Sequence, residues 1–436
     1  MPQSHVVTSS SEAVTLISTA SGAQEWQYGP INASSRCVVV KGTAVVKNHV
    51  YAGAYDGWIH KIAFATGAPL AKFEVGGPVR GLTYADDVLY ANVGNSLQAH
   101  DPVTGPLWTH RMGDLAWGDP VWSNGIVYAG SWDRKLYAIE ANGTPAWIST
   151  AFEFFASEPA VADGVVYASG YDTDSHEPCL AALDAASGEV LWQAQAPNKE
   201  TIVDPVAVGD GRVYAPTGWG ALMCAFDAAT GAAQWSLSTK PHPATPLFSD
   251  GRIYVASQHS VSGGRLQAYD SDTGALLWTS QALIGSAGQS VSRPTVDEGD
   301  VTNYVLVTSQ DGYLQAFDRD TGELAWKAAI GDGGWPNDPT WTDAAGPPIR
   351  PGRLREYRAV DPLALILPGP VYVDLNLPYP PPVEAIVARL RKSASPRRRE
   401  EVESALSELR RIGSYVASLQ KAIQGEVGRG PGGIQQ

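Results

Sequence analysis

The chain has 436 residues, of which 44% are hydrophobic and 17% charged, and its formal net charge is -14. Such a composition is that of a globular protein, and the length allows more than one domain. The charge is uneven, because residues 347–436 hold 14 Arg and Lys against 9 Asp and Glu, which leaves 17 against 36 in residues 1–346. So acidic an N-terminal region argues against nucleic acid as its partner.

The first residues, MPQSHVVTSS, contain neither a basic region nor a long apolar run, and they already fit a β-strand. For the chain as given, we therefore expect no signal peptide, no membrane partner and a cytoplasmic location. Cys37, Cys179 and Cys224 fall in separate repeats without paired spacing. We expect them to be small buried hydrophobic side chains, with a single disulfide as the alternative.

A repeat of roughly 36 to 48 residues runs from the first residues to about residue 330. Each unit has two alternating apolar runs, a polar turn with Gly, and a Trp a few residues later. These pairs are Gly22/Trp26, Gly105/Trp108, Gly143/Trp147, Gly188/Trp192, Gly231/Trp235, Gly274/Trp278 and Gly322/Trp326. Gly67 opens a further unit, in which Phe73 stands near the Trp position. Eight such units are typical of propeller blades.

A complete unit, residues 119–150, contains four strands, PVWS, IVYAG, KLYAIE and PAWIS, which we call A to D. Residues 1–30 supply only B, C and D. The missing strand has a match in residues 338–346, DPTWTDAAG, which resemble the DPVW that begins at Asp119. We therefore expect an all-β, eight-bladed propeller over residues 1–346, in which the last strand closes the first blade and removes the open edges.

The expected blades follow one another with short connections. They cover residues 1–30 with 336–346, then about 36–75, 78–112, 117–150, 155–196, 201–240, 243–282 and 288–330. The repeated Gly suits a positive φ in the turn between C and D. Side chains that can cap this turn are those of Asp184, Asp227, Asp270 and Asp318. The repeated Trp suits packing on a neighbouring blade. We assign these residues to the fold.

Repeats of the form VYAG…LYAIDAATGEVLW resemble the pyrroloquinoline quinone (PQQ) type propeller repeat. This repeat occurs in quinoprotein dehydrogenases, in the outer-membrane assembly lipoprotein and in uncharacterised binding proteins. The dehydrogenases as a family carry adjacent cysteines and a calcium-binding Glu/Asn/Asp set, whereas no two cysteines are adjacent here. The lipoprotein needs an export signal and a lipid-bearing cysteine near its start. The resemblance therefore implies a PQQ-like propeller without PQQ, and without any other cofactor, that is neither of these proteins.

One rim of the expected propeller carries the starts of the A strands and the B–C turns, and it collects aromatic and acidic residues. The turns supply Tyr55, Asp56, Trp132, Asp133, Tyr171, Asp172, Trp219 and Asp311, and the strand starts supply Asp119, Glu158, Asp204 and Asp338. As a functional site, this rim suits a cationic or peptide-like partner. The alternative is that Asp-Gly and Trp-Asp are hairpin turn chemistry and that Asp-Pro begins the inner strands.

Other candidates for chemistry are weaker. Asp172, Asp174 and His176 alternate in an insertion of the fifth blade, but no Gly is placed for a calcium loop, and a solvated acidic loop is the better interpretation. Elsewhere, His60, His100 and His259 form no constellation with a Ser or Cys nucleophile. We assign no catalytic residue and no metal.

Beyond the propeller, residues 347–382 are predicted to be a proline-rich linker with a short hairpin, residues 383–425 a helical hairpin or coiled coil, and residues 426–436 a disordered tail. The second helix has apolar positions at heptad spacing that form a seam for another helix of this chain or of a second one. The seam consists of Val402, Leu409, Ile412, Val416, Leu419 and Ile423.

Arg397, Arg398 and Arg399 fall in the first turn of that helix, where the macrodipole favours negative charge. They suit docking onto the acidic rim or onto a partner's carboxylates. The alternative is that Glu400, Glu401 and Glu403 offset their charge.

The sequence thus favours a binding or scaffold protein, and two function classes remain. In the first, the rim recognises a protein partner or ligand and the helical module couples it to another protein, by analogy with bacterial signalling or defence assemblies. In the second, the protein is a propeller-type lyase or hydrolase that uses rim carboxylates, with or without a metal.

Overall fold

The computed structural model describes residues 4–10, 13–31, 40–46, 48–149, 155–171, 180–197, 202, 204–217, 222–239, 243–257, 263–281, 284, 291–296, 302–331 and 340–343. All of them belong to the first of two compact units, residues 1–359 and 360–436. The expected linker, helical module and tail lie outside the described residues, as do Arg397–Arg399 and the seam from Val402 to Ile423. Their boundaries remain predictions.

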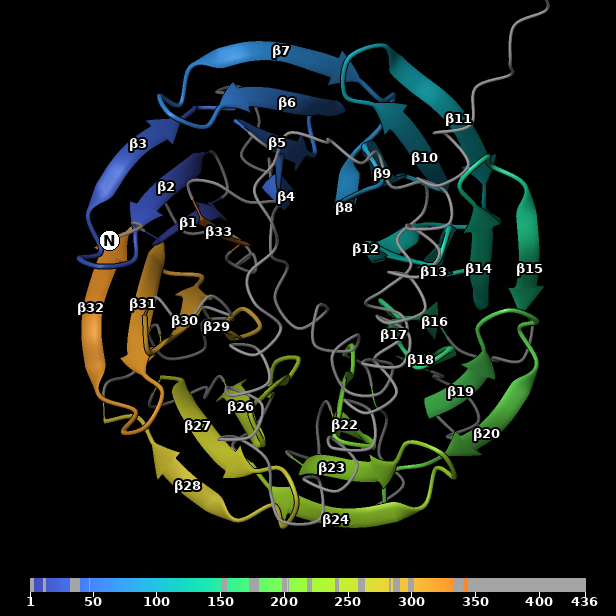
Figure 1. Ribbon diagram of the computed structural model, residues 1–436, viewed down its shortest axis with the longest axis vertical. Helices are drawn as coiled ribbons and strands as arrows, with labels where there is room; N and C mark the ends of the chain where they lie inside the picture. Colours follow the sequence, from blue (N-terminus) through green and yellow to red (C-terminus); the bar gives the residue numbers. More distant parts are fainter. Residues whose placement is uncertain are drawn as a thin grey trace, which may run out of the picture. The chain divides into compact units, whose positions relative to one another are not determined.

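The described strands form eight antiparallel sheets that follow one another around a ring (Figure 1). The first sheet contains, from its outer edge inward, β3 (Gln24–Tyr28), β2 (Val14–Ser18), β1 (Ser4–Ser9) and β33 (Thr340–Asp343). The second contains β4 (Val40–Val46), β5 (His49–Ala54), β6 (Trp58–Ala63) and β7 (Pro69–Glu74). The third contains β8 (Val79–Ala85), β9 (Val88–Val93), β10 (Ser96–Asp101) and β11 (Gly105–Arg111). The fourth contains β12 (Ala116–Ser123), β13 (Ile126–Ser131), β14 (Lys135–Glu140) and β15 (Pro145–Ser149).

In the other four sheets the strands again follow one another in chain order, and the innermost strand of the fifth sheet is divided in two. The fifth contains β16 (Phe155–Ala156), β17 (Ala160–Ala162), β18 (Val165–Tyr171), β19 (Leu180–Asp184) and β20 (Val190–Ala194). The sixth contains β21 (Ala207–Gly209), β22 (Arg212–Pro216), β23 (Leu222–Asp227) and β24 (Ala233–Ser238). The seventh contains β25 (Leu247–Ser249), β26 (Arg252–Ser257), β27 (Arg265–Asp270) and β28 (Leu276–Thr279). The eighth contains β29 (Thr295–Val296), β30 (Tyr304–Ser309), β31 (Tyr313–Asp318) and β32 (Leu324–Ala329).

The first sheet joins the two ends of the propeller. Strand β33 pairs antiparallel with β1, with Thr342 opposite His5 and Trp341 opposite Val6. The expectation that a strand after the last repeat closes the first blade is therefore confirmed. Because this pairing covers the inner edge of β1, no open edge is left where the ends of the ring meet.

The core lies between adjacent sheets. Strands B and C are almost fully buried, as in β13, whereas the outer strand β15 is half exposed. Leu136 and Tyr128 of the fourth sheet pack in one cluster with Val166 and Leu183 of the fifth. Apolar residues fill both faces of the middle strands because each blade lies between two others, which explains their nearly continuous hydrophobic runs.

The repeated Gly and Trp form a contact from each blade to the next. At seven of the eight junctions a Cβ on the turn Gly would lie within about 3 Å of the indole of the preceding blade, as the distance of 2.5 Å at Gly188 to Trp147 illustrates. The pairs are Gly67/Trp26, Gly143/Trp108, Gly188/Trp147, Gly231/Trp192, Gly274/Trp235, Gly322/Trp278 and Gly22/Trp326. Each indole also donates to a backbone carbonyl of that next blade, for example Trp147 Nε1 to Ala185 O at 3.0 Å. The packing role expected for the Trp is therefore confirmed.

The junction between the second and third blades differs, as the repeat indicates. Ala71, opposite Lys61 in the pairing of β6 and β7, stands at the Trp position, and Phe73 lies two residues further on. A Cβ on Gly105 would meet nothing within 4 Å. The expected Asp caps are also present. Asp227 Oδ1, for example, accepts hydrogen bonds from the backbone nitrogens of Ala229 and Thr230 at 3.1 and 2.9 Å.

Candidate functional site

Tyr55 and Arg80 join the second and third sheets at the rim that carries the B–C turns. Tyr55 lies in the turn between β5 and β6, and Arg80 lies in β8. The guanidinium carbon of Arg80 is 5.3 Å from the centre of the Tyr55 ring, and its Nη1 donates a hydrogen bond to Tyr55 Oη at 3.2 Å. Burial raises the pKa of Tyr55 while Arg80 acts in the opposite direction, so the hydroxyl stays neutral at physiological pH.

Trp117 and Trp132 continue this contact into the fourth sheet. The Arg80 guanidinium lies 5.4 Å from the Trp117 ring, so the cation is placed between two aromatic faces. Trp117 packs on Trp132 with ring centres 5.2 Å apart and 34° between the planes. The two indoles are 37% and 38% exposed. We call Tyr55, Arg80, Trp117 and Trp132 the aromatic ladder.

Two of the predicted carboxylates link three successive sheets near the starts of the inner strands. Asp119 Oδ1 accepts a hydrogen bond from the backbone nitrogen of Leu82 at 2.8 Å. The backbone nitrogen of Asp119 donates to Glu158 Oε2 at 3.0 Å. Both carboxylates therefore order the inner strands, whatever else they bind.

Glu158 also forms an ion pair across the ring. Its Oε1 lies 2.9 Å from Nη2 of Arg293, which precedes β29 in the eighth sheet, and the side chains are only 9% and 12% exposed. Arg293 stands before Pro294, at the repeat position that Asp119, Glu158 and Asp204 occupy in other blades. Arg293, at a position that holds a carboxylate in several other blades, thus supplies the counter-charge of Glu158.

Asp204 is an inner carboxylate with perturbed acidity. It is partly buried, and burial raises its pKa to about 6, although the positive charge of Arg293 acts in the opposite direction. A carboxyl group with this pKa exchanges its proton close to neutral pH, which is the property required of a general acid or base.

The other described rim carboxylates contact their own turns or neighbouring segments. Asp56 Oδ1 accepts from the backbone nitrogen of Trp58 at 3.0 Å. Asp133 accepts from the backbone nitrogen of Gly113 at 2.8 Å and from the Tyr137 hydroxyl. Asp311 accepts from the Ser309 hydroxyl. The contacts of Asp56 with Trp58 and of Asp311 with Ser309 are those of hairpin turns. Asp133 instead joins its turn to the loop before β12 and to β14, and Asp56 also contacts His60.

Some of the predicted site residues belong to segments that are not described. Asp172, Asp174, His176, Trp219 and Asp338 lie outside the described residues, and of Tyr171 only the backbone, at the end of β18, is described. In the part of the chain that is described, no group of three His, Cys, Asp or Glu side chains is arranged to hold a metal ion. Cys224 is fully buried, as expected, whereas Cys37 and Cys179 fall outside the described ranges.

Sequence analysis missed Arg80, Trp117 and Arg293, and it gave no role to His60. The position before Pro294 was a usable signal for Arg293. His60 does take part in a constellation, though with neither Ser nor Cys, because its ring nitrogens contact Asp56 and Tyr28. His100 contacts Gln98 through Nε2 at 3.0 Å in the interior of the third sheet.

The eight sheets, their overlap closure and the Gly/Trp contacts define an eight-bladed β-propeller built from PQQ-like repeats. The sequence profile of the family described as outer membrane protein assembly factor BamB matches residues 93–203 and 176–354. These segments cover more than half of the chain, and the chain therefore belongs to this family.

Individual relatives are more distant. The quinohemoprotein alcohol dehydrogenase ADH IIB of Pseudomonas putida is 33% identical over 138 residues, which are 28% of this chain and 20% of that protein. This chain thus matches only about a fifth of the length of that relative. The dehydrogenase feature named above, a pair of adjacent cysteines, does not occur in this sequence, and the expectation that PQQ is not bound stays a prediction.

Solved structures share the fold. The computationally designed protein Ika8 superposes with a TM-score of 0.60 at 16% identity, over 70% of this chain and 93% of that one. BamB from Moraxella catarrhalis superposes with a TM-score of 0.56 at 16% identity, over 71% of this chain and 97% of that one. Within the described ranges, no helix has the length and hydropathy needed to cross a membrane.

Proposed function

We propose that this propeller binds a protein partner at its rim and that the aromatic ladder anchors the interface. The observation that carries the proposal is the exposure of Trp117 and Trp132, at 37% and 38%, as a packed pair. Large aromatic side chains with Arg are the residues most enriched among binding hot spots. The similarity to BamB, a protein described as an assembly factor, supports a partner of this class.

The ladder is preorganised. Arg80 is fixed by the Tyr55 hydroxyl and by two ring faces, and Trp117 is fixed by Trp132. Side chains already held in one conformation lose little entropy on binding, so more of the contact energy appears as affinity.

The charge around the ladder favours a basic segment of the partner. Residues 1–346 hold 36 acidic against 17 basic residues. Asp114 is exposed in the loop before β12, and its backbone carbonyl accepts a hydrogen bond from Ser131 Oγ, one residue before Trp132. A segment that combines Arg or Lys with an apolar residue would place a cation at Asp114 and its apolar group on the indoles.

The helical module expected at residues 383–425 then couples this binding to a second protein or to self-association. Deleting residues 347–436 should leave a folded propeller that still binds at the rim but loses the second interaction. Retention of both interactions by the shortened protein would rule out the coupling role.

Site-specific photocrosslinking in the cells of origin tests the rim proposal. A crosslinking amino acid at Asp114 should capture one discrete protein, and Trp117→Ala should reduce the yield about tenfold. The control position is Leu191 of β20, which is 52% exposed on an outer strand and should capture nothing specific. Equal capture at both positions, or a yield unaffected by Trp117→Ala, would contradict the proposal.

A second candidate function rests on Asp204. Its pKa of about 6 supports a lyase or hydrolase in which this carboxyl group transfers a proton, with Arg293 and Glu158 beside the reacting group. If so, Asp204→Asn abolishes turnover of the substrate and leaves capture at Asp114 unchanged. Loss of capture with intact fold would instead assign Asp204 to the binding site.

A further inference from the structure

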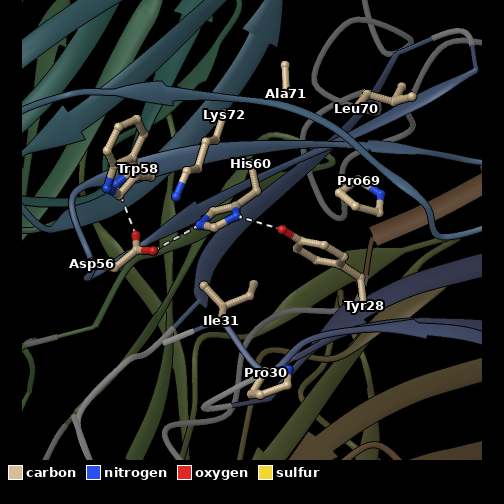
Figure 2. Close-up of a pocket in the computed structure, with 10 residues that line it drawn as sticks. All are labelled: Tyr28, Pro30, Ile31, Asp56, Trp58, His60, Pro69, Leu70, Ala71 and Lys72. Atoms are coloured by element: carbon tan, nitrogen blue, oxygen red, sulfur yellow. Dashed lines mark hydrogen bonds and ion pairs between the residues drawn. The ribbon is translucent and has the colours of Figure 1, made fainter. Parts of the chain in front are cut away.

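A pocket of about 580 Å³ lies on the side of the propeller between the first and second sheets (Figure 2). Tyr28, at the end of β3, and Ile31 line it from the first sheet, whereas His60 of β6 and Leu70 and Lys72 of β7 line it from the second. Its volume is in the range of small-molecule sites. It is distinct from the aromatic ladder, although Asp56 in its wall is the neighbour of Tyr55 in the same turn.

We propose that this pocket binds a small carboxylate that carries a flat apolar body and a hydroxyl group. In this arrangement, Lys72 pairs with the carboxylate, the apolar wall holds the body, and Tyr28 accepts a hydrogen bond from the hydroxyl. The proposal goes beyond partner binding at the rim and does not depend on it.

His60 determines which groups on the pocket floor donate hydrogen bonds and which accept them. It is only 5% exposed, and its Nε2 lies 3.0 Å from Asp56 Oδ2 while its Nδ1 lies 3.0 Å from Tyr28 Oη. A carboxylate only accepts hydrogen bonds, so Nε2 carries the hydrogen. Burial lowers the pKa of His60, and the neutral ring then leaves Nδ1 as an acceptor.

The tautomer determines what Tyr28 offers to a ligand. Since Nδ1 accepts, the Tyr28 hydroxyl donates its single hydrogen to His60. The dashed line between the two side chains in Figure 2 marks this contact. The oxygen of Tyr28 keeps lone pairs for a donor in the pocket. A hydroxyl group of a ligand satisfies this requirement, whereas a second acceptor placed there would be repelled.

Lys72 supplies the positive charge. It stands opposite His60 in the pairing of β6 and β7, and its Nζ lies 4.5 Å from the centre of the Trp58 ring. Among the described residues, no carboxylate lies within ion-pair distance of this ammonium group. An ammonium group held on an indole face, in a propeller otherwise rich in acidic residues, is a site for an anion.

Apart from Asp56, whose carboxylate contacts His60 and the backbone nitrogen of Trp58, the rest of the lining is apolar and suits a flat body. Ile31 is 3% exposed, Leu70 is 51% exposed, and Pro30, Pro69 and Ala71 complete the wall. An exposed Leu beside a concave surface gains burial when an aromatic or cyclic ligand covers it. A fully polar anion such as phosphate would leave this wall uncovered.

The test uses the full-length protein and a panel of probes of different lengths: 4-hydroxybenzoate, 4-hydroxyphenylacetate and 4-hydroxycinnamate. Benzoate lacks the hydroxyl group, and 4-hydroxybenzyl alcohol lacks the carboxylate. Isothermal titration calorimetry should give saturable binding for at least one hydroxylated acid, weaker binding for benzoate, and none for the alcohol at the same concentrations.

Two substitutions separate the two polar contacts. Lys72→Met should weaken every acid about tenfold, while Tyr28→Phe should weaken only the hydroxylated acids, about threefold to tenfold. The matched control is Lys61→Met. Lys61, in β6, is another lysine whose ammonium lies over a ring, that of Tyr51 at 5.6 Å, but it does not line the pocket. Trp117→Ala, in the ladder, should also leave the titrations unchanged.

The proposal is overturned by absence of saturable binding for all the acids, or by equal effects of Lys72→Met and Lys61→Met. Equal loss for benzoate and 4-hydroxybenzoate in Tyr28→Phe would overturn the role of the hydroxyl group. Melting temperatures of the variants, measured alongside, distinguish these results from unfolding.

Discussion

Glu158 and Arg293 are 135 positions apart in the chain, yet Glu158 Oε1 and Arg293 Nη2 are 2.9 Å apart in the structure. The fifth and eighth sheets carry these residues, and both side chains are largely buried. Replacing one partner of this ion pair tests whether contacts across the ring, as well as contacts between neighbouring blades, stabilise the inner strands.

Removal of the carboxylate should therefore destabilise the propeller. We expect Glu158→Gln to lower the free energy of unfolding by about 2–3 kcal/mol, slightly less than is usual for a broken buried pair, because Asp204 remains near Arg293. The control is Asp272→Asn, which breaks the pair with Arg212, where Asp272 is 70% exposed, and should cost less than about 1 kcal/mol. Urea denaturation measures both. Equal effects of the two substitutions would show that the Glu158 pair does not support the fold.

Asp204 should make stability depend on pH in an unusual direction. Its ordinary pKa is 3.8, and burial raises the folded-state pKa to about 6. Between these values the folded state holds a proton that the unfolded state releases, so this group's contribution to stability falls as the pH rises through that range. Asp204→Asn should stabilise the protein by about 1–2 kcal/mol at pH 7, after allowance for solvent screening, and leave it unchanged near pH 3.5.

Thermal melts across this pH range check the prediction for Asp204. Asp227→Asn is a control of opposite sign, because hydrogen bonds from Thr230 lower the pKa of Asp227. Its loss should reduce stability at neutral pH but not well below its ordinary pKa. If Asp204→Asn destabilised the protein equally at all pH values, its carboxyl group would be a structural hydrogen-bonding residue without perturbed acidity.

The contact of Trp147 with Gly188 allows a matched pair of substitutions in one blade. Gly188 and Gly164 have φ of +73° and +76°, so a Cβ strains both equally, but only at Gly188 would it strike an indole, at 2.5 Å. We expect Gly188→Ala to cost about 1–3 kcal/mol more than Gly164→Ala. Differential scanning calorimetry of the two variants measures the difference, and equal melting temperatures would contradict the interlocking role of the indole.

Closure of the first blade predicts a sharp limit to truncation. A protein that ends at residue 346 keeps β33 and should melt cooperatively, close to the full-length protein. One that ends at residue 335 loses β33, leaves the inner edge of β1 unpaired and should unfold or aggregate. Circular dichroism melts and size-exclusion chromatography compare the two; indistinguishable behaviour would show that the closing strand is dispensable.

The sequence was sufficient to predict the blades because their main contacts are local and repeated. A turn Gly recurs in the units, with an Asp cap in several of them, and the Trp recurs in seven. Each of these seven Trp residues meets the Gly of the next unit, so one rule describes seven junctions. Even the exception was visible, since the unit that begins at Gly67 lacks the Trp, and Gly105 has no indole to meet.

The candidate site was predicted only in part. Tyr55 and Trp132 were found because they share one turn position, whereas Arg80 and Trp117 lie at strand starts that differ from blade to blade. That Glu158 meets Arg293 depends on the diameter of the closed ring, which no local pattern encodes. Similarly, Tyr28 and His60 meet because two successive blades pack side by side, and nothing in the spacing of the two residues signals their contact.

The affinity of the captured partner for variants of the ladder tests the central claim most directly. With the partner identified by crosslinking at Asp114, biolayer interferometry would compare the wild type, Trp117→Ala, Trp132→Ala and the double variant. We expect each single substitution to weaken binding at least about tenfold, and the double variant to lose less than the sum, because the two indoles pack on each other. The control Leu191→Ala, on an outer strand, should bind with an affinity within about twofold of the wild type. Affinities of the ladder variants within that same range would contradict the account.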